Sequence, residues 1–206
     1  MKIVIATRNP KKAEEMQRIA DAVETKRVTV LTLNDIPETE GIPQAEENGK
    51  TFIENARKKA KYWADILQMP VLAEDSGIEI DALDGAPGVY TKRCMAELCP
   101  GEDINVDRPS ELYPKLLKLM SESGKSTRQA HWISSVVIAF PNGLHFIEAQ
   151  NSLKGKMCEC AGEREFGFDQ YFKPNGQSKT LSEMTIEEKD EIGPRSKSIK
   201  EVFQKI

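Results

Sequence analysis

The first part of the chain predicts a strand, a helix and a second strand. Residues 2–6 form a short apolar run that is typical of a buried strand. Asn9 and Pro10 then predict the start of a helix, because asparagine is a favoured N-cap and proline suits the first helical position. Residues 27–33 alternate between apolar and polar types, which predicts another strand. The apolar stripe of the helix between the strands consists of Met16, Ile19, Ala20 and Val23.

A second helix and two short strands follow a polar segment. Residues 34–48 carry two prolines and a glycine and are expected to form a loop. Thr51 and Glu54 have the spacing of a capping box, which predicts the start of a helix. Residues 71–73 predict a buried strand that ends at two carboxylates, and residues 78–83 alternate like a separate strand.

The middle of the chain predicts an antiparallel meander. A long strand is expected at 129–140, and Pro141-Asn142-Gly143 predicts a hairpin turn after it. The return strand is expected at 144–153, and a third strand near 155–160 extends the meander. This antiparallel portion is expected to form a second lobe.

Three further helices and an aromatic loop complete the pattern. A helix is expected near 110–122, with Pro114 confining its regular part to one side. Residues 163–177 predict a loop, and residues 185–191 and 196–205 predict closing helices. The pattern as a whole predicts an α/β fold with a mixed sheet flanked by helices.

Composition and charge narrow the class of protein. Hydrophobic residues make up 39% and charged residues 30% of the 206 positions, which suits one domain, 1–206, with a well-solvated surface. The net charge of −4 argues against general nucleic-acid binding, which needs a basic face. No apolar run approaches the roughly 18 residues that a membrane span needs. The chain is therefore expected to be soluble, without nucleic-acid or membrane partners.

The cysteines and histidines do not predict a metal site of their own. The four cysteines lack a paired C-x-x-C zinc pattern, and two histidines are too few for a histidine-rich site. The first residues also lack the layout of a signal peptide. Reduced thiols in a cytoplasmic protein are the expected state. These residues are Cys94, Cys99, Cys158, Cys160, His131 and His145.

The turn after the first strand is a candidate anion site. Thr7, Asn9 and Lys12 lie where a strand feeds a basic turn that opens a helix, and free N–H groups there attract anions. Pattern alone favours an ordinary βα turn with surface lysines, because the glycines of a P-loop are absent.

Two pairs of carboxylates are candidate ligands for a cation. Glu74 and Asp75 follow a buried strand, and Mg²⁺ prefers oxygen ligands and usually takes one or two protein carboxylates. Side chains alternate along an extended chain, so one of the two is expected to face the site. A solvated acidic turn is an equal alternative. Glu46 and Glu47 could complete a metal site from a second direction, although such a pair is most often solvated.

The remaining candidates are aromatic or cationic. Two phenylalanines around a glycine in Glu165-Phe166-Gly167-Phe168-Asp169 could stack on a base, and the acid could bind its edge. Core packing is the commoner explanation of such a segment. Lys59, Lys189 and Arg195 would by themselves be surface charges. Without a histidine beside a cysteine or serine, the available chemistry is that of a metal, a carboxylate and water.

Several segments together have the order and spacing of a known family. The chain resembles the inosine triphosphate pyrophosphatase family, also called the Ham1 or RdgB-like family, over nearly its whole length. Two C-terminal segments, Phe166-Gly167-Phe168-Asp169 and Glu187-Glu188-Lys189, look like its base-binding segments. The N-terminal segments are Thr7-x-Asn9-x-x-Lys12, the run from Glu46 to Ala60, Ala73-Glu74-Asp75-Ser76-Gly77, and Gly85-Ala86-Pro87-Gly88-Val89-Tyr90-x-x-Arg93.

The resemblance implies a fold and an activity. The fold would be an elongated two-lobed α/β domain with the active site in the cleft between the lobes, usually as a homodimer. The activity would be hydrolysis of non-standard purine triphosphates such as ITP, dITP and XTP to the monophosphate and pyrophosphate. Glu46 and Asp75 would ligate Mg²⁺, with Asp75 also accepting the proton of the attacking water.

The resemblance also implies which residues contact the nucleotide. Ser76 would lie against the phosphates. The triphosphate would be held by Thr7, Asn9, Lys12 and Lys59. The base would be met by Phe166, Gly167, Phe168, Asp169, Lys189 and Arg195, with Phe166 stacking on it.

The chain departs from the family pattern in the base-selecting part. The family usually reads Ser-His-Arg near the end, and this chain has Gly193-Pro194-Arg195, so the histidine that helps to read a 6-oxo group is absent. Glu165 and Gln170 replace residues that are commonly glycine and proline. Glu74 stands where aspartate is frequent, which keeps the charge.

Two alternatives therefore stay open beside the pyrophosphatase of the family. One is a diverged member that acts on a different modified or normal nucleotide, and the other is a nucleotide-binding protein with little turnover. Glu46, Asp75 and Lys12 favour an enzyme, because a pure binder has less need for a metal and a base.

Overall fold

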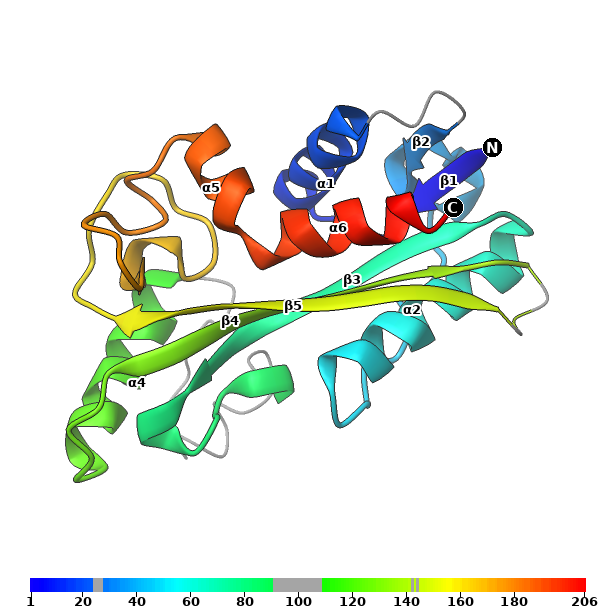
Figure 1. Ribbon diagram of the computed structural model, residues 1–206. Helices are drawn as coiled ribbons and strands as arrows, with labels where there is room; N and C mark the ends of the chain where they lie inside the picture. Colours follow the sequence, from blue (N-terminus) through cyan, green and yellow to red (C-terminus); the bar gives the residue numbers. More distant parts are fainter. Residues whose placement is uncertain (24–27, 91–108, 142, 144) are drawn as a thin grey trace. The chain divides into compact units, whose positions relative to one another are not determined.

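The computed structural model describes residues 1–23, 28–90, 109–141, 143 and 145–206. Its sheet has six strands in the order β2-β1-β3-β4-β5-β6 (Figure 1). The strands are β1 (Lys2–Ile5), β2 (Thr29–Thr32), β3 (Val71–Ile80), β4 (Gln129–Ala139), β5 (Phe146–Met157) and β6 (Phe172–Pro174). The helices are α1 (Pro10–Ala22), α2 (Phe52–Leu67), α4 (Pro109–Glu122), α5 (Ile186–Ile192) and α6 (Pro194–Gln204). The predicted α/β class with a mixed sheet is confirmed.

The chain divides into two compact units, and each has its own apolar core. The first unit comprises Met1–Ser76, Ser134–Asn151 and Gly193–Ile206, and the second comprises Gly77–Ile133 and Ser152–Ile192. The long strands β3, β4 and β5 therefore each contribute residues to both units.

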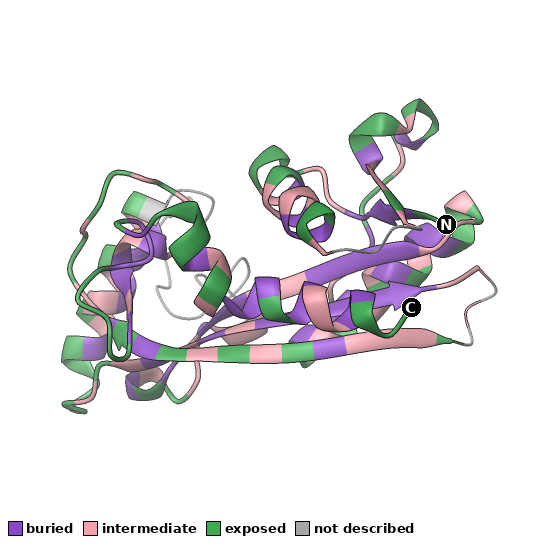
Figure 2. Ribbon diagram, turned by 45° about the horizontal axis from the view of Figure 1, so that its top comes forward, coloured by how far each residue is buried: buried purple, intermediate pink, exposed green. Residues whose placement is uncertain are grey.

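Strand alternation builds a three-layer first unit. Ile3 and Ile5 of β1 belong to a buried cluster with residues of α1 and α6, whereas Val4 and Ala6 belong to a cluster with residues of α2. Successive side chains of a strand point to opposite faces, so one run of apolar residues fills both cores. In Figure 1, α1 and α6 lie on one side of the sheet and α2 lies on the other. Figure 2 shows these inner strands largely buried and the helices buried on one side.

The first two helices begin where the sequence predicts. The side chain of Asn9 caps α1 by accepting from the Lys12 N–H at 3.2 Å, and Thr51 caps α2 by accepting from the Glu54 N–H at 3.3 Å. The capping box is only half as predicted, because the Glu54 carboxylate accepts from the N–H of Lys50 at 2.7 Å.

The prediction of two separate strands at 71–73 and 78–83 is wrong. β3 runs unbroken from Val71 to Ile80, and a short 3-10 turn, Asp81–Leu83, follows it. Glu74, Asp75 and Ser76 therefore lie within a strand. The polar residues interrupt the apolar pattern because they belong to a site, and they do not end the strand.

The third strand of the meander also lies elsewhere than predicted. β5 continues to Met157, so residues 155–160 form no strand of their own. The partner is β6, which pairs antiparallel with β5 and places Met157 opposite Phe172. Of the predicted hairpin turn, residues 142 and 144 lie outside the described residues.

Helix α4 continues through Pro114 and is not confined to one side of it. Pro114 removes an N–H from the helix, but it is exposed, so the carbonyl left without a partner can be hydrated. Leu112 and Leu116 are buried in the core of the second unit and hold the helix in place. That core also contains Ile78, Ile80, Tyr113, Met120, Trp132, Tyr171, Phe172 and Leu181.

Among the described residues, every helix is too short or too polar to span a bilayer.

The pairing of β5 with β6 requires glycine at position 155. A Cβ atom on Gly155 would lie 2.6 Å from the carbonyl oxygen of Lys173 and closer still to the ring of Phe172. We expect Gly155→Ala to lower the free energy of unfolding by about 1–3 kcal/mol through overpacking, measured by urea denaturation. Lys156→Ala is the control, because Lys156 is exposed, and it should change stability by less than about 0.5 kcal/mol. Equal effects of the two substitutions would contradict the prediction.

Candidate functional site

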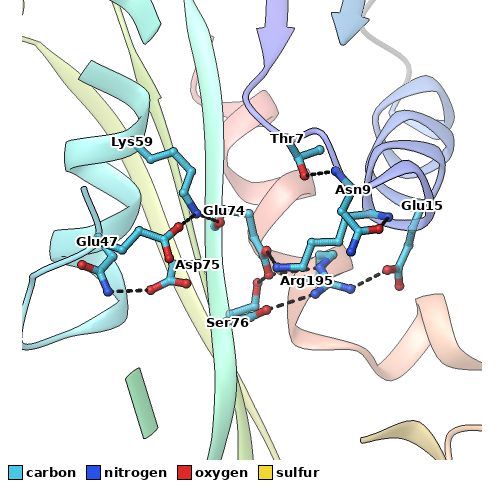
Figure 3. A network of polar contacts seen from close by, with 12 residues as sticks. Thr7, Asn9, Glu15, Glu47, Lys59, Glu74, Asp75, Ser76 and Arg195 are labelled. Atoms are coloured by element: carbon cyan, nitrogen blue, oxygen red, sulfur yellow. Dashed lines mark hydrogen bonds and ion pairs between the residues drawn. The ribbon is translucent and has the colours of Figure 1, made fainter. Parts of the chain in front are cut away.

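A polar site lies where β1 ends and β3 continues. The pairing of the two parallel strands finishes with Ile5 opposite Leu72, and the N–H of Ala6 still donates to the Leu72 carbonyl at 2.8 Å. The chain then leaves the sheet at Thr7 and turns into α1, while β3 runs on to Ile80. Polar side chains of β3 thus lie beside a helix start, at the kind of edge where α/β sheets bind ligands (Figure 3).

The turn before α1 is ordered by its own side chains. The hydroxyl of Thr7 accepts from the N–H of Asn9 at 3.2 Å, and Asn9 caps the helix through Lys12. The amino group of Lys12 donates to Glu74 at 2.9 Å. The structure therefore brings together all three residues predicted for the anion site, next to β3.

Strand alternation separates the two carboxylates of β3. Glu74 and Ser76 point to the face of α1 and α6, and Asp75 points to the face of α2, as Figure 3 shows. The sequence predicted that one of Glu74 and Asp75 would face a site and the other would face away. Both have cationic neighbours, on opposite faces of the same strand.

Glu74 is a buried carboxylate held by two cations and a hydroxyl. One oxygen, Oε1, accepts from Arg195 Nε and from Ser134 Oγ, both at 3.0 Å, and Oε2 accepts from Lys12. Its side chain is 1% exposed. Burial by itself would raise the pKa of Glu74, but the positive charges of Arg195 and Lys12 outweigh it and hold the pKa well below its ordinary value. Glu74 is therefore charged and fully engaged.

Asp75 lies in a different environment and is only half-buried. Its Oδ2 accepts from Asn55 Nδ2 of α2 at 3.0 Å. Burial raises the pKa of Asp75, and the nearby charge of Lys59 and the bond from Asn55 only partly offset this. A carboxylate with a raised pKa is a better proton acceptor, which is what a general base needs.

Lys59 joins the strand to the loop before α2. Its amino group donates to the Glu74 backbone carbonyl at 3.1 Å and forms an ion pair with Glu47 at 2.5 Å. Glu46, the predicted ligand, is exposed, and the described residues show no contact between it and Asp75. The residue of the acidic pair that reaches the site in this structure is therefore Glu47.

The carboxylates of this site suit a cation that needs few protein ligands. Within the described residues, no group of three or more His, Cys, Asp or Glu side chains could hold a metal ion. Mg²⁺ usually takes one or two carboxylates and fills its other positions with water and substrate phosphates. Asp75, with Glu46 or Glu47 from the neighbouring loop, fits that requirement, whereas a closed structural metal site does not.

Arg195 belongs to the first unit and to the same network as Glu74. Besides Glu74, its guanidinium donates to Ser76 Oγ at 3.0 Å and forms an ion pair with Glu15 of α1. The side chain of Arg195 is 4% exposed. The sequence placed Arg195 with the base-binding residues, and in the structure its guanidinium contacts residues of β3 and α1.

The predicted base-binding residues gather in the second unit. Lys189 forms a buried ion pair with Asp169, 2.6 Å from Nζ to Oδ2. The same amino group lies 4.8 Å from the ring centre of Phe166 and 5.6 Å from that of Trp132. A half-buried aromatic ring beside a buried ion pair offers stacking and hydrogen bonding together.

Phe168 has a packing role. Its ring makes edge contacts with Tyr113, Trp132 and Phe172 in the core of the second unit. Gly167 has φ of +55°, a conformation that favours glycine, and lets the neighbouring rings diverge. Of the two phenylalanines predicted to meet a base, Phe166 is therefore the one with its ring beside the ion pair.

The chain is similar to known proteins over nearly its whole length. A model of the Ham1 family matches residues 3–205. The chain belongs to the Ham1 family. A dITP/XTP pyrophosphatase of Elusimicrobium minutum is 36% identical over 208 residues, covering 100% of both chains, and one of Thermus thermophilus is 35% identical, covering 99% of this chain and 91% of its own length. The predicted family is confirmed.

Solved structures have the same fold. A HAM1 protein from Coxiella burnetii superposes with a TM-score of 0.81 at 26% identity, over 100% of both chains. A dITP/XTP pyrophosphatase from Mycobacterium abscessus superposes with a TM-score of 0.70 at 32% identity, over 96% of this chain and 95% of its own.

The departure from the usual Ham1 pattern falls at the start of α6. Gly193 is the N-cap of this helix and makes no side-chain cap hydrogen bond, and Pro194 occupies the first turn. Glycine is tolerated at an N-cap, and proline is favoured at the first helical position. The substitution therefore keeps the helix start and removes the polar side chains that a serine and a histidine would supply.

Sequence reasoning missed several residues of the Ham1 site. Ser134 and Glu15 hold Glu74 and Arg195, but they lie far from these residues in the sequence and carry no local signal. Asn55 was part of the family motif without an assigned role, although its position in a capped helix one residue after Glu54 was readable.

The charge on Glu74 should make the free energy of unfolding depend on pH. The lowered pKa means that its stabilising charge is fully present above about pH 4.3, the ordinary glutamate value, and is lost as the pH falls further. We expect Glu74→Gln to lower the free energy of unfolding at pH 7 by about 3 kcal/mol, because two cations lose their counter-charge.

Urea denaturation between pH 7 and pH 3 measures this effect. The difference between wild type and Glu74→Gln should shrink below about pH 4.3, because the Glu74 carboxylate then takes up a proton in the unfolded state while it stays charged in the folded state. Glu159→Gln is the control, because Glu159 is exposed and 3.9 Å from Arg128. A Glu74→Gln difference that is constant over this range would show that the charge is not the cause.

Proposed function

We propose that the chain is a nucleoside-triphosphate pyrophosphatase that hydrolyses non-standard purine triphosphates such as dITP, XTP and ITP to the monophosphate and pyrophosphate. The observation that carries the proposal is the arrangement along β3. Glu74 and Ser76 adjoin two cations on one face, and Asp75, with a raised pKa, lies beside Lys59 on the other. The names of the relatives, dITP/XTP pyrophosphatase, support the same substrate class.

The triphosphate is bound by residues of the first unit. The ammonium group of Lys12 has three N–H donors and uses one of them for Glu74, so it can also donate to phosphate oxygens. Thr7 and Asn9 order the turn that presents the first N–H groups of α1, and such groups favour anions. Lys59 adds a second amino group from α2.

Mg²⁺ is the proposed cofactor, held by Asp75 with Glu46 or Glu47. A bound Mg²⁺ would polarise a phosphoryl oxygen and neutralise charge on the leaving pyrophosphate. The chain's own contribution is the orientation of Asp75 by Asn55 and the acceptance of a proton from the attacking water at its carboxylate.

The base is bound by residues of the second unit. Phe166 would stack on the purine, and the ion pair of Lys189 with Asp169 would meet its polar edge. Lys189 donates and the carboxylate accepts, so this pair can bind a carbonyl and an N–H of a 6-oxo purine.

Asp75 should be required for turnover. We expect Asp75→Asn to lower the rate of pyrophosphate release about 10²- to 10⁴-fold, because an amide accepts no proton and is a weak Mg²⁺ ligand. The assay is a panel of dITP, ITP, XTP, ATP, GTP, CTP and UTP with Mg²⁺. Asp65→Asn is the control, since the side chain of Asp65 forms a surface ion pair with Lys61 on α2, and it should leave the rate unchanged.

Each other outcome of the panel has a separate meaning. Undiminished turnover by Asp75→Asn would refute the role of Asp75. Wild-type preference for some other triphosphate would indicate a diverged substrate, for which the change to Gly193-Pro194 supplies a reason. Nucleotide binding without any turnover would identify a binding protein.

Phe166 should determine how tightly the base is held. Stacking on an aromatic ring contributes about 1–3 kcal/mol per base, so Phe166→Ala should raise KM for dITP about tenfold to a hundredfold. The affinity of the Phe166→Ala variant for inorganic tripolyphosphate, which has no base, should stay at the wild-type value when measured by calorimetry. An unchanged KM would contradict base stacking on Phe166.

A further inference from the structure

Two adjacent serines of β4 are buried, and their side chains point to different faces of the sheet. Ser134 and Ser135 are both 0% exposed. Ser134 donates to Glu74, and Ser135 donates to the Gln150 side chain at 2.6 Å. We propose that Ser134 is a positioning residue of the triphosphate site, whose hydroxyl orients the Glu74 carboxylate and thereby places Lys12 and Arg195. This inference rests on the proposed function, because it concerns the same site.

The two oxygens of Glu74 are divided between its partners. Ser134 and Arg195 donate to Oε1, Lys12 donates to Oε2, and the Ser76 side chain also forms a hydrogen bond with the carboxylate. The terminal torsion of a glutamate is broad and roughly two-fold, so it sets no orientation of the carboxylate by itself. The plane of the carboxylate must therefore be fixed by its hydrogen bonds.

A neutral donor is suited to fix this plane. Lys12 has a long side chain that can follow the carboxylate if it rotates, whereas the Ser134 hydroxyl is attached directly to a central strand of the sheet. Without that hydroxyl, Oε1 would lose the donor that is fixed to β4, and the amino group of Lys12 could compete for either oxygen. The Lys12 ammonium group would then occupy several positions and no longer a single one.

Ser134 is itself held by the helix that carries Arg195. Ser198 Oγ donates to the Ser134 backbone carbonyl at 3.0 Å and accepts from Asn151 Nδ2 at 3.1 Å. Arg195 and Ser198 are three residues apart in α6 and therefore share a face of the helix. The start of α6 and Ser134 are thus fixed to each other, and Glu74 lies between the two donors.

The experiment measures binding of inorganic tripolyphosphate by calorimetry, without nucleotide or metal. We expect Ser134→Ala to raise the Kd about tenfold. Ser134→Thr keeps the hydroxyl and should restore most of the affinity. Ser135→Ala is the control, since it removes the hydroxyl of the neighbouring buried serine and one part-buried hydrogen bond on the other face, and it should change the Kd by less than about twofold.

The readout separates positioning from a general loss of stability. Both alanine variants should lower the melting temperature, but only Ser134→Ala should weaken binding. If Ser134→Ala fails to fold, Ser134→Cys supplies a residue of similar volume with a weak donor, and it should show the same loss. Affinity of the Ser134 variant within about twofold of wild type, or an equal loss in Ser135→Ala, would overturn the inference.

Hydrolysis assays distinguish this inference from the proposed function. Wild-type protein that binds tripolyphosphate but hydrolyses no nucleoside triphosphate would refute the function and leave the role of Ser134 intact. Full hydrolysis of dITP by wild type, together with unchanged tripolyphosphate binding in Ser134→Ala, would refute the role of Ser134 alone. Wild-type protein that binds no tripolyphosphate would overturn the inference whatever the hydrolysis assay gives.

Discussion

The desolvated carboxylate of Glu74 is the constraint on which the first unit depends. A carboxylate that is 1% exposed is costly unless opposite charges and hydrogen bonds surround it. Lys12 from α1, Arg195 from α6 and Ser134 from β4 supply these groups. The requirement therefore ties two helices and two strands to one point, and it brings positive charge to the place where a polyphosphate needs it.

Because side chains alternate along β3, the neighbouring residues Glu74 and Asp75 have different roles. On one face, the negative charge of Glu74 is balanced by the side chains of Lys12 and Arg195. On the other face, Asp75 is half-buried and has a raised pKa. Among the side-chain donors of the described residues, Asn55 alone binds it. Adjacent acids of one motif thus acquire different chemistry from their surroundings. This difference depends on the helices that cover each face, which a motif does not contain.

Local patterns predicted the elements well and their long-range partners poorly. The N-caps at Asn9 and Thr51 were readable because they depend on residues three positions apart. β6 was missed because its three residues, Phe172–Pro174, are shorter than any periodic signal and are defined by pairing with β5. For the same reason the candidate site was predicted as a set of residues, while the partners Glu15 and Ser134 were not.

The start of α6 shows how a helix can begin without polar side chains at its first positions. Gly193 and Pro194 are both compatible with the first positions of a helix, so α6 begins here without a polar side-chain cap. Both positions are buried, so packing as well as polarity restricts which side chains can stand there. A change at the start of α6 must therefore fit the packing around Arg195 before it can alter how this helix meets a ligand.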